Sequence, residues 1–310
     1  MWFALLLLAV SAITAAVRMS RRRAFGLRDD TLRRLPVGVD GIIPGAEAFE
    51  LTHPEGGAPA VLLLHGGGDT PQALRYLAAY LYEHGYDVRA PLLPGHGRTV
   101  REFSRVSADE WLQAARSAYR ELAALHDWVG IAGLSMGGAI AVQVAAETPT
   151  LPALALLAPY FAMPAYIAAA ARLAPIWAPL APFVRAIDPA AAPSIHDRAE
   201  ADRSLGYGVF TPIALRALHR TVMRAIEVLP NVHAPTLMIQ SREDNRVSPP
   251  AAQRAFDRLG TRDKELVWLT GAGHVITVDY GREQIFQRVV DFFARHRRGA
   301  SLPLTKFREH

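Results

Sequence analysis

The 310 residues are 51% hydrophobic and 20% charged, which supplies a large buried core and excludes a disordered chain or a purely polar interaction protein. The net charge is +5, but the arginines gather near the N-terminus and no aromatic residues alternate with a basic stripe. We therefore expect no nucleic-acid partner. The absence of cysteine excludes disulfides, thiolate metal ligands and a cysteine nucleophile.

The chain begins with an uncharged apolar segment, residues 1–17, which a basic stretch follows at once. At about 1.5 Å per residue this segment reaches about 25 Å, near the lower limit for a transmembrane helix. A signal peptide carries positive charge before its apolar region, whereas here the charge follows it. We therefore expect a membrane anchor with the rest of the chain on the cytoplasmic side. The alternatives are a cleaved signal peptide, giving a secreted or periplasmic protein, or a mis-assigned start.

Beyond the anchor, short apolar segments alternate with helical patterns. Residues 60–64 form a continuous apolar run closed by glycines, which is typical of a strand buried on both faces of a parallel sheet. Ser107, with Glu110 three residues later, predicts a capped helix over 108–125. The other expected strands are 46–52, 87–91, 128–132, 154–157, 236–240 and 267–269, and the other expected helices of the core are 71–85, 139–147 and 284–295. This alternation predicts an α/β fold with a mostly parallel, doubly wound sheet.

Residues 160–229 interrupt the alternation, because they hold several prolines and no convincing strand. Two pieces of this stretch, 165–173 and 212–229, have helical patterns. The stretch is expected to be a helical cap that lies over a site, rather than an ordinary helical excursion. The predicted division of the chain is an anchor (1–17), a basic linker (18–45), the first part of the core (46–159), the cap (160–229), the second part of the core (230–298) and a tail (299–310).

A nucleophile motif, Gly133-Leu134-Ser135-Met136-Gly137, stands between an expected strand and an expected helix. The Gly-x-Ser-x-Gly pattern alone is weak, but this position is the one that a nucleophile elbow requires. The flanking glycines remove Cβ atoms that would clash around the strained serine backbone. The helix N-terminus behind the serine favours developing negative charge. Ser135 is therefore the predicted nucleophile of a serine hydrolase.

A serine hydroxyl needs a base that takes its proton. In a fold with this elbow, the partners follow along the chain in the order serine, acid, histidine. His274 lies in a glycine-rich loop directly after the last expected strand, so it is the predicted base. The rivals, which precede a strand or lie in the basic tail, are His233, His296 and His310.

The acid is expected on the loop that follows the strand 236–240. Asp244 lies on that loop and is the predicted partner that holds the ring of His274 in the productive tautomer. Glu243 and Asp279 are the rivals, and for Asp279 a helix cap or a surface position is the better expectation.

Two backbone N–H groups are needed to stabilise the oxyanion. One is expected from Met136, directly after the nucleophile, and the other from Gly67, in the loop after the strand 60–64. His65 and His96 are expected to shape their loops, because no carboxylate or cysteine pattern accompanies them as a metal site would require. No metal and no cofactor are expected.

With these residues placed, the chain resembles the bacterial carboxylesterases and monoacylglycerol lipases of the α/β-hydrolase superfamily. The matching pieces are Leu63-Leu64-His65-Gly66, Pro94-Gly95-His96-Gly97, Gly133-Leu134-Ser135-Met136-Gly137-Gly138, the Asp244 loop and Gly273-His274-Val275-Ile276-Thr277-Val278-Asp279. The resemblance implies the α/β-hydrolase fold, ester hydrolysis through an acyl-enzyme, no metal, and a small helical cap that accepts the acyl chain. It assigns Ser135, Asp244 and His274 as the triad, and Gly67 and Met136 as the oxyanion donors.

Two features depart from that pattern. The relatives often carry a bulky residue at the position of Gly67, so the wall of the acyl pocket is expected to be more open here. The triple glycine Gly66-Gly67-Gly68 is instead similar to the hormone-sensitive-lipase group, although the serine motif is not. The N-terminal anchor also lies outside the usual soluble pattern.

The predicted function is therefore serine-dependent hydrolysis of small-molecule esters with short to medium acyl chains, with monoacylglycerols among the candidates. A thioesterase, lysophospholipase or amidase of the same fold is one alternative, and a non-enzymatic ligand-binding protein of this fold is another. Apolar residues in the cap suggest a hydrophobic substrate, with ordinary packing of cap on core as the alternative explanation. These residues are Tyr166, Ile167, Leu173, Ile176, Trp177, Leu180, Phe183 and Val184. The sequence predicts no oligomeric state.

Overall fold

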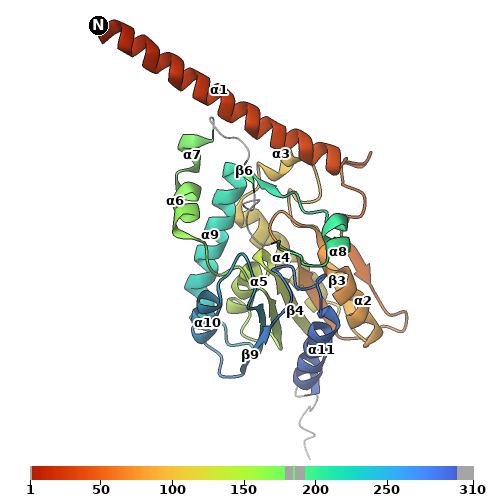
Figure 1. Ribbon diagram of the computed structural model, residues 1–310. Helices are drawn as coiled ribbons and strands as arrows, with labels where there is room; N and C mark the ends of the chain where they lie inside the picture. Colours follow the sequence, from red (N-terminus) through yellow and green to blue (C-terminus); the bar gives the residue numbers. More distant parts are fainter. Residues whose placement is uncertain (1, 179–183, 186–192, 299–310) are drawn as a thin grey trace, which may run out of the picture.

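A computed structural model describes residues 2–178, 184–185 and 193–298, so the predicted tail, 299–310, lies outside the described residues. The core is a seven-stranded sheet with the order β1-β3-β2-β4-β5-β8-β9 (Figure 1). Its strands are β1 (Phe49–Leu51), β2 (Ala60–Leu64), β3 (Asp87–Ala90), β4 (Val129–Leu134), β5 (Leu154–Leu157), β8 (Thr236–Ser241) and β9 (Lys264–Leu269). Only the β1–β3 pair of this sheet is antiparallel. The predicted α/β fold with a mostly parallel sheet is confirmed.

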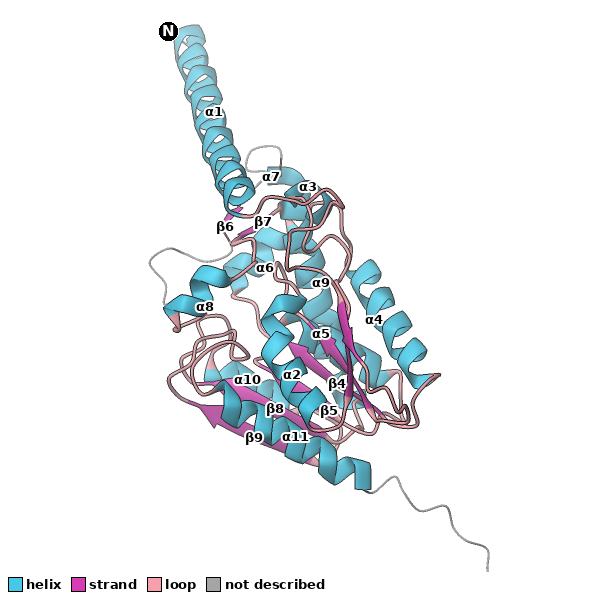
Figure 2. Ribbon diagram, turned by 90° about the vertical axis from the view of Figure 1, so that its right-hand side faces the viewer, coloured by secondary structure: helices cyan, strands magenta, loops and turns pink. Residues whose placement is uncertain are grey.

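Helices cover both faces of the sheet, which explains why β2 is buried along its whole length (Figure 2). One face packs on η1 (Pro71–Leu74), α2 (Arg75–Glu83) and α11 (Arg282–Arg298), and the other on α4 (Ala108–Ala123), α5 (Met136–Ala146) and α10 (Pro249–Asp257). Successive side chains of a strand point to opposite faces. Accordingly, Val61 and Leu63 join the cluster with α2 and α11, and Leu62 and Leu64 join the cluster with α4 and α5.

The start of α4 has the capping box that the sequence predicts. The backbone N–H of Glu110 donates to Ser107 Oγ at 3.2 Å, and the N–H of Ser107 donates to Glu110 Oε2 at 2.8 Å. The short helix α3 (Val100–Phe103) begins with the same arrangement, formed by Thr99 and Glu102. These reciprocal bonds satisfy amide groups that a helix start otherwise leaves without partners.

The segment between β5 and β8 is mainly helical, as its sequence pattern predicts. It contains α6 (Ala165–Arg172), α7 (Ala174–Trp177), α8 (Arg198–Arg203), α9 (Pro212–Val228) and η2 (Leu229–Asn231), together with a short hairpin of β6 (Val184–Arg185) and β7 (Val209–Phe210). The sequence did not predict this hairpin, because two-residue strands are too short to show an alternating pattern. Helix α9 packs against α5, the helix behind Ser135, so the cap is joined directly to the core.

Not all of the apolar cap residues that suggest a hydrophobic substrate pack inward. Tyr166, Leu173 and Ile176 are 76%, 52% and 74% exposed, which places them on the outer surface of α6 and α7 or beside it. Leu180 and Phe183 lie outside the described residues, as does the side chain of Val184. The cap therefore carries an exposed apolar surface in addition to its contacts with the core.

The N-terminal region forms one helix, α1 (Trp2–Arg34), that projects beyond the body of the protein (Figure 1). The predicted linker, 18–45, is therefore helical over its first half, because no residue between 18 and 34 blocks a helix and Pro36 stops it directly afterwards. In the described part of the chain, which excludes the side chains of residues 1–9, no helix is long and apolar enough to cross a membrane. The membrane anchor over 1–17 stays a prediction.

Candidate active site

Ser135 occupies a sharp turn between β4 and α5. Its backbone lies at φ 54° and ψ −117°, a strained conformation for a residue with a side chain. The turn is tight enough to require both flanking glycines. A Cβ at Gly137 would lie 2.0 Å from the carbonyl oxygen of Leu64, and one at Gly133 would lie 2.5 Å from the carbonyl oxygen of Gly137. The N–H of Ser135 donates to Leu157 O at 3.0 Å, which fixes the turn to the neighbouring strand.

The structure brings the three predicted triad residues together. His274 Nε2 lies 2.7 Å from Ser135 Oγ, and His274 Nδ1 lies 2.8 Å from Asp244 Oδ2. An ionised carboxylate only accepts hydrogen bonds, so the proton of a neutral ring lies on Nδ1 and Nε2 is free to accept from the serine hydroxyl. The side chains of His274 and Asp244 are 7% and 0% exposed, so this chain of hydrogen bonds is shielded from water.

Asp244 is held as a carboxylate by its surroundings. Its Oδ1 accepts from the backbone N–H of Arg246 at 2.7 Å and of Val247 at 3.0 Å, and its Oδ2 accepts from Gln240 Nε2 at 2.6 Å. Burial alone would raise the pKa of Asp244, but the pairing with His274 and the two amides outweigh it and the pKa lies below its ordinary value. Asp244 is therefore ionised at neutral pH, as a partner of an imidazolium must be.

The other candidates for the base and the acid lie elsewhere. Glu243, about half exposed, accepts from the N–H of Gly271 at 2.9 Å and makes no contact with His274. His233 is exposed and precedes β8. His296 lies near the C-terminal end of α11 and pairs with Asp263 at 3.0 Å. His310 lies outside the described residues.

The expectation for Asp279, a helix cap or a surface position, is wrong. Asp279 is fully buried and its carboxylate accepts hydrogen bonds from four backbone N–H groups. The donors are Gly273 at 2.7 Å, and His196, Asp197 and Tyr280 at 2.9 Å each. Asp279 thus joins the loop that carries His274 to residues 196–197 of the cap. The apolar residues Ile276 and Val278 around it were the signal in the sequence that this carboxylate is buried.

The two predicted oxyanion donors lie on adjacent loops. A Cβ at Gly67 would lie 3.1 Å from the sulfur of Met136, and a Cβ at Gly66 would lie 3.4 Å from the Cβ of Ser135. Neither the N–H of Gly67 nor that of Met136 has an acceptor among the described residues. Both amides are therefore available for a negatively charged oxygen beside Ser135.

His65 and His96 stabilise the loops behind this site. The Nδ1 of His65 donates to Gly66 O at 2.9 Å, while its Nε2 accepts from the N–H of Leu93 at 3.0 Å. The ring of His96 packs edge-on against that of His65, with the centroids 4.9 Å apart. Burial lowers the pKa of His65 to about 4, and it lowers the pKa of His96 as well, so both rings are neutral. Among residues 2–178, 184–185 and 193–298, no three His, Asp or Glu side chains are grouped as metal ligands.

The cap reaches down to the loop that carries Gly67. The N–H of Tyr207 donates to Gly68 O at 2.8 Å. The ring of Phe210 lies so close to the loop that a Cβ at Gly68 would be 3.3 Å from it. The cap and the predicted oxyanion loop are therefore in direct contact.

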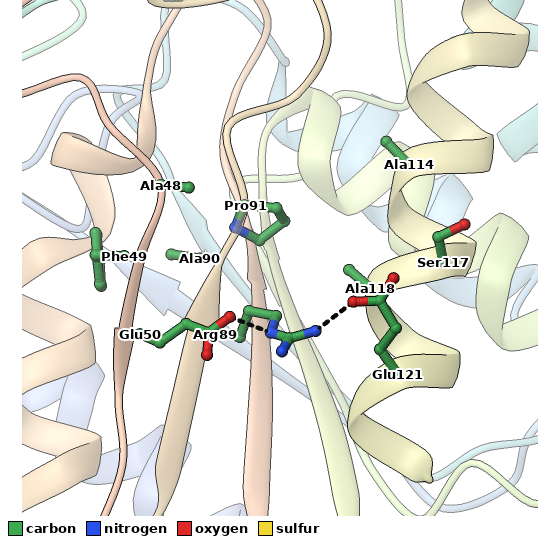
Figure 3. A pocket seen from close by; sticks show the side chains of 10 residues that line it. All are labelled: Ala48, Phe49, Glu50, Arg89, Ala90, Pro91, Ala114, Ser117, Ala118 and Glu121. Atoms are coloured by element: carbon green, nitrogen blue, oxygen red, sulfur yellow. Dashed lines mark hydrogen bonds and ion pairs between the residues drawn. The ribbon is translucent and has the colours of Figure 1, made fainter. Parts of the chain in front are cut away.

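A separate surface depression of about 390 Å³ lies between β1, β3 and α4 (Figure 3). Arg89 crosses it, paired with Glu50 at 2.6 Å and with Glu121 at 2.8 Å. Ser117 contributes the one hydroxyl of its lining, and no histidine lines it. The depression therefore lacks the groups for nucleophilic catalysis, and its one arginine is paired with two glutamates.

Residues 57–280 match the sequence profile of the family Hydrolase_4, described as serine aminopeptidase, S33. A thermostable monoacylglycerol lipase from Bacillus sp. (strain H-257) is 28% identical over 256 residues, which are 82% of this chain and 97% of that protein. A carboxylesterase from Bacillus subtilis (strain 168) is 26% identical over 243 residues, 78% of this chain and 94% of that protein.

Solved structures of lipolytic enzymes also match this chain along most of its length. One from a study of LipS and LipT, two metagenome-derived lipolytic enzymes, is 32% identical with a TM-score of 0.70, and covers 82% of this chain and 100% of its own. The monoacylglycerol lipase of Paleococcus ferrophilus has the same fold, with a TM-score of 0.66 at 22% identity over 81% of this chain and 99% of its own. The chain therefore belongs to the Hydrolase_4 family and is a serine hydrolase of the α/β-hydrolase fold.

Proposed function

We propose that this protein hydrolyses carboxylic esters with short to medium acyl chains through an acyl-enzyme on Ser135. The observation that carries the proposal is the chain of hydrogen bonds from Ser135 Oγ through His274 to Asp244, at 2.7 and 2.8 Å. The names of the two Bacillus relatives, a monoacylglycerol lipase and a carboxylesterase, support the same reaction.

In the proposed reaction, Ser135 Oγ attacks the carbonyl carbon of the ester while His274 Nε2 takes the hydroxyl proton. The carbonyl oxygen becomes an oxyanion, which the N–H groups of Gly67 and Met136 stabilise. When the bond to the alcohol breaks, His274 gives its proton to the departing oxygen and the acyl group stays on Ser135. A water molecule, deprotonated by His274, then attacks the acyl carbon. The bond to Ser135 Oγ breaks, His274 returns the proton to that oxygen, and the acid leaves. Asp244 stabilises the imidazolium in both halves of the reaction.

Monoacylglycerols are the candidate substrates within this class. An acyl chain needs apolar surroundings, and the cap that contacts the Gly67 loop supplies the aromatic residues Tyr207 and Phe210. Gly67 adds no side chain at a place where a Cβ would lie 3.1 Å from the sulfur of Met136 and 3.5 Å from the ring of Phe210. The family's description as a serine aminopeptidase makes an amide substrate the second candidate, because the same triad cleaves both bonds.

The test compares the wild-type chain with Ser135→Ala. The variant loses hydrolysis of p-nitrophenyl acyl esters and labelling by a fluorophosphonate probe, while its melting temperature stays within a few degrees of the wild type. Normal turnover by the variant would contradict the proposal. Failure of the probe to label the wild type would favour a non-enzymatic ligand-binding protein instead.

A panel of substrates then separates the reactions that share this site. It holds p-nitrophenyl esters of increasing acyl length, a monoacylglycerol, a lysophospholipid, an acyl thioester and an amino-acid p-nitroanilide. The highest kcat/KM is expected for an ester with a short to medium chain, and a higher value for the anilide or the thioester would reassign the substrate class.

We also propose that residues 1–17 anchor the protein in a membrane with the catalytic domain on the cytoplasmic side. The support is the uncharged segment itself and the arginines that follow it, Arg18 and Arg21 to Arg23. The full chain is expected to stay with membranes after carbonate extraction, and a chain lacking residues 2–17 is expected to be released. Signal cleavage predicts instead a mature protein without residues 1–17, which its intact mass would reveal.

A further inference from the structure

The C-terminal end of α1 is bonded to one short segment of the cap, residues 204–210, which we name the clamp segment. Three backbone carbonyls of this segment accept hydrogen bonds from two side chains of α1. Arg34 Nη1 donates to Ser204 O at 3.3 Å, and Arg34 Nη2 donates to Gly206 O. The one hydroxyl proton of Thr31 is shared between Leu27 O within α1, at 3.0 Å, and Tyr207 O, at 3.4 Å. Figure 1 shows this end of the helix directly above the cap, beside β6.

Arg34 differs from the other arginines near it. Arg28 pairs with Asp29 at 2.7 Å, and Arg33 pairs with Asp30 on the exposed side of the helix. Arg34 forms no such ion pair within the described part of the chain, and its guanidinium is directed at the carbonyls of the clamp segment instead. Packing against the clamp segment lowers the pKa of Arg34, although the residue as a whole stays exposed. A guanidinium that donates to two backbone carbonyls of another segment indicates a specific contact between that segment and α1.

The clamp segment continues to the loop of the predicted oxyanion hole. One residue, Tyr207, receives a bond from Thr31 at its carbonyl and donates from its N–H to Gly68 O at 2.8 Å. Its hydroxyl also bonds to the backbone of Arg98 at 2.8 and 2.9 Å, which fixes the ring. Three residues further on, the ring of Phe210 lies against the same glycine loop. Tyr207 and Phe210 thus connect the clamp segment to the loop that carries Gly67.

We infer that α1 positions the oxyanion loop through the clamp segment, and that Arg34 is a positioning residue for the hydrolysis. This inference rests on the proposed function, because it assigns Gly67 as an oxyanion donor. The family match begins at residue 57, so α1 lies outside the part of the chain that the family shares. Gly66 O accepts from the ring of His65 and from the N–H of Asp69, whereas Gly68 O accepts from the clamp segment. The clamp segment therefore affects the geometry of the loop at its Gly68 end.

The expected effect falls on catalysis more than on substrate binding. An oxyanion forms in the transition state and not in the bound ester, so a displaced Gly67 amide lowers kcat with little change in KM. Complete loss of one oxyanion donor costs about 10²- to 10³-fold in kcat. Because Arg34 acts through the clamp segment, Arg34→Ala is expected to lower kcat by about tenfold, with KM changed less than about twofold.

The experiment uses the full chain in detergent micelles with a p-nitrophenyl ester. It compares Arg34→Ala and Arg34→Lys with the control Arg33→Ala. The control removes the same charge one position earlier, from a side chain that pairs with Asp30 and not with the clamp segment. Arg33→Ala is expected to match the wild type, and Arg34→Lys to recover part of the lost kcat. A trifluoromethyl ketone, which forms a tetrahedral adduct on the serine, is expected to bind Arg34→Ala about tenfold more weakly.

Equal kcat values and equal ketone affinities for Arg34→Ala and Arg33→Ala would overturn the inference. If Arg34→Ala does not fold, Arg34→Met decides in its place, because it keeps the aliphatic stem and removes the guanidinium that bonds to the clamp segment. The same losses in Arg34→Met support the inference, and wild-type kinetics overturn it. A wild-type chain that no fluorophosphonate labels would contradict the proposed function instead, so the two failures are distinguishable.

Discussion

Gly137→Ala tests the packing that holds the nucleophile turn. The added methyl carbon would lie 2.0 Å from the carbonyl oxygen of Leu64, 2.5 Å from the carbonyl carbon and 2.7 Å from the carbonyl oxygen of His65. These are backbone atoms of β2 and of the residue after it, so no side-chain rotation relieves the overlap. Restoring ordinary contact requires that α5 move by about 1 Å relative to the sheet, and both elements are buried.

The magnitude follows from that displacement. Overpacking a core usually costs about 1–3 kcal/mol, and a clash with fixed backbone belongs at the upper end. A loss of about 3 kcal/mol lowers the melting temperature of a domain of this size by roughly 6–12 °C. A displacement of about 1 Å at the N-terminus of α5 also moves Ser135 and the amide of Met136, which is expected to cost about 100-fold in kcat.

Differential scanning fluorimetry and p-nitrophenyl ester kinetics measure the two effects. The control is Gly26→Ala, the same change at a position in α1 with no atom within 4 Å of the new methyl group. The control is expected to keep its activity and its melting temperature, since alanine favours a helix over glycine. A Gly137→Ala protein that melts within about 2 °C of the wild type and retains at least a third of its kcat would refute this reasoning.

Three further predictions address the buried polar groups. Asp244→Asn is expected to keep the fold and to lower kcat about 10⁴-fold, because the amide cannot hold the productive tautomer of His274; a loss under tenfold contradicts this. Asp279→Ala leaves four backbone amides without an acceptor and is expected to lower the urea-derived free energy of unfolding by at least about 3 kcal/mol, whereas a loss below about 1 kcal/mol contradicts it. The pKa of His65 is about 4 in the folded protein and about 6.5 in the unfolded chain. This difference contributes about 3 kcal/mol to the free energy of unfolding, which is fully present above pH 6.5 and is lost as the pH falls through 4. Between pH 7 and pH 4, the free energy of unfolding is expected to decline less steeply in His65→Asn than in the wild type. The exposed variant His84→Asn is expected to decline like the wild type, and equal slopes for all three proteins would contradict the assignment.

The sequence predicts the sheet and the triad because both depend on local patterns. Apolar runs such as Ala60–Leu64 mark strands that are buried on both faces, and parallel strands end at the same edge of a sheet. Ser135, Asp244 and His274 each follow such a strand, so their order along the chain predicts that they meet.

The remaining features depend on contacts between distant segments, for which no local pattern exists. Asp279 gathers amides from residues 196–197 and 273, so its role depends on how the cap meets the core. Arg34 reaches carbonyls about 170 positions further along the chain. The sequence shows that Arg34 is basic, but only the folded arrangement shows that it differs from Arg33 beside it.

The continuity of α1 has a consequence for how the protein would meet its substrate. A helix of 33 residues is about 50 Å long, and its C-terminal end is fastened to the cap. With residues 1–17 in a bilayer as proposed, about 25 Å of stiff helix would separate the membrane from that fastening. A flexible tether lets an enzyme sample every orientation within its reach. A continuous helix instead holds the cap at one orientation and one distance from the bilayer. The cap would then face the lipid surface from which an acyl ester arrives.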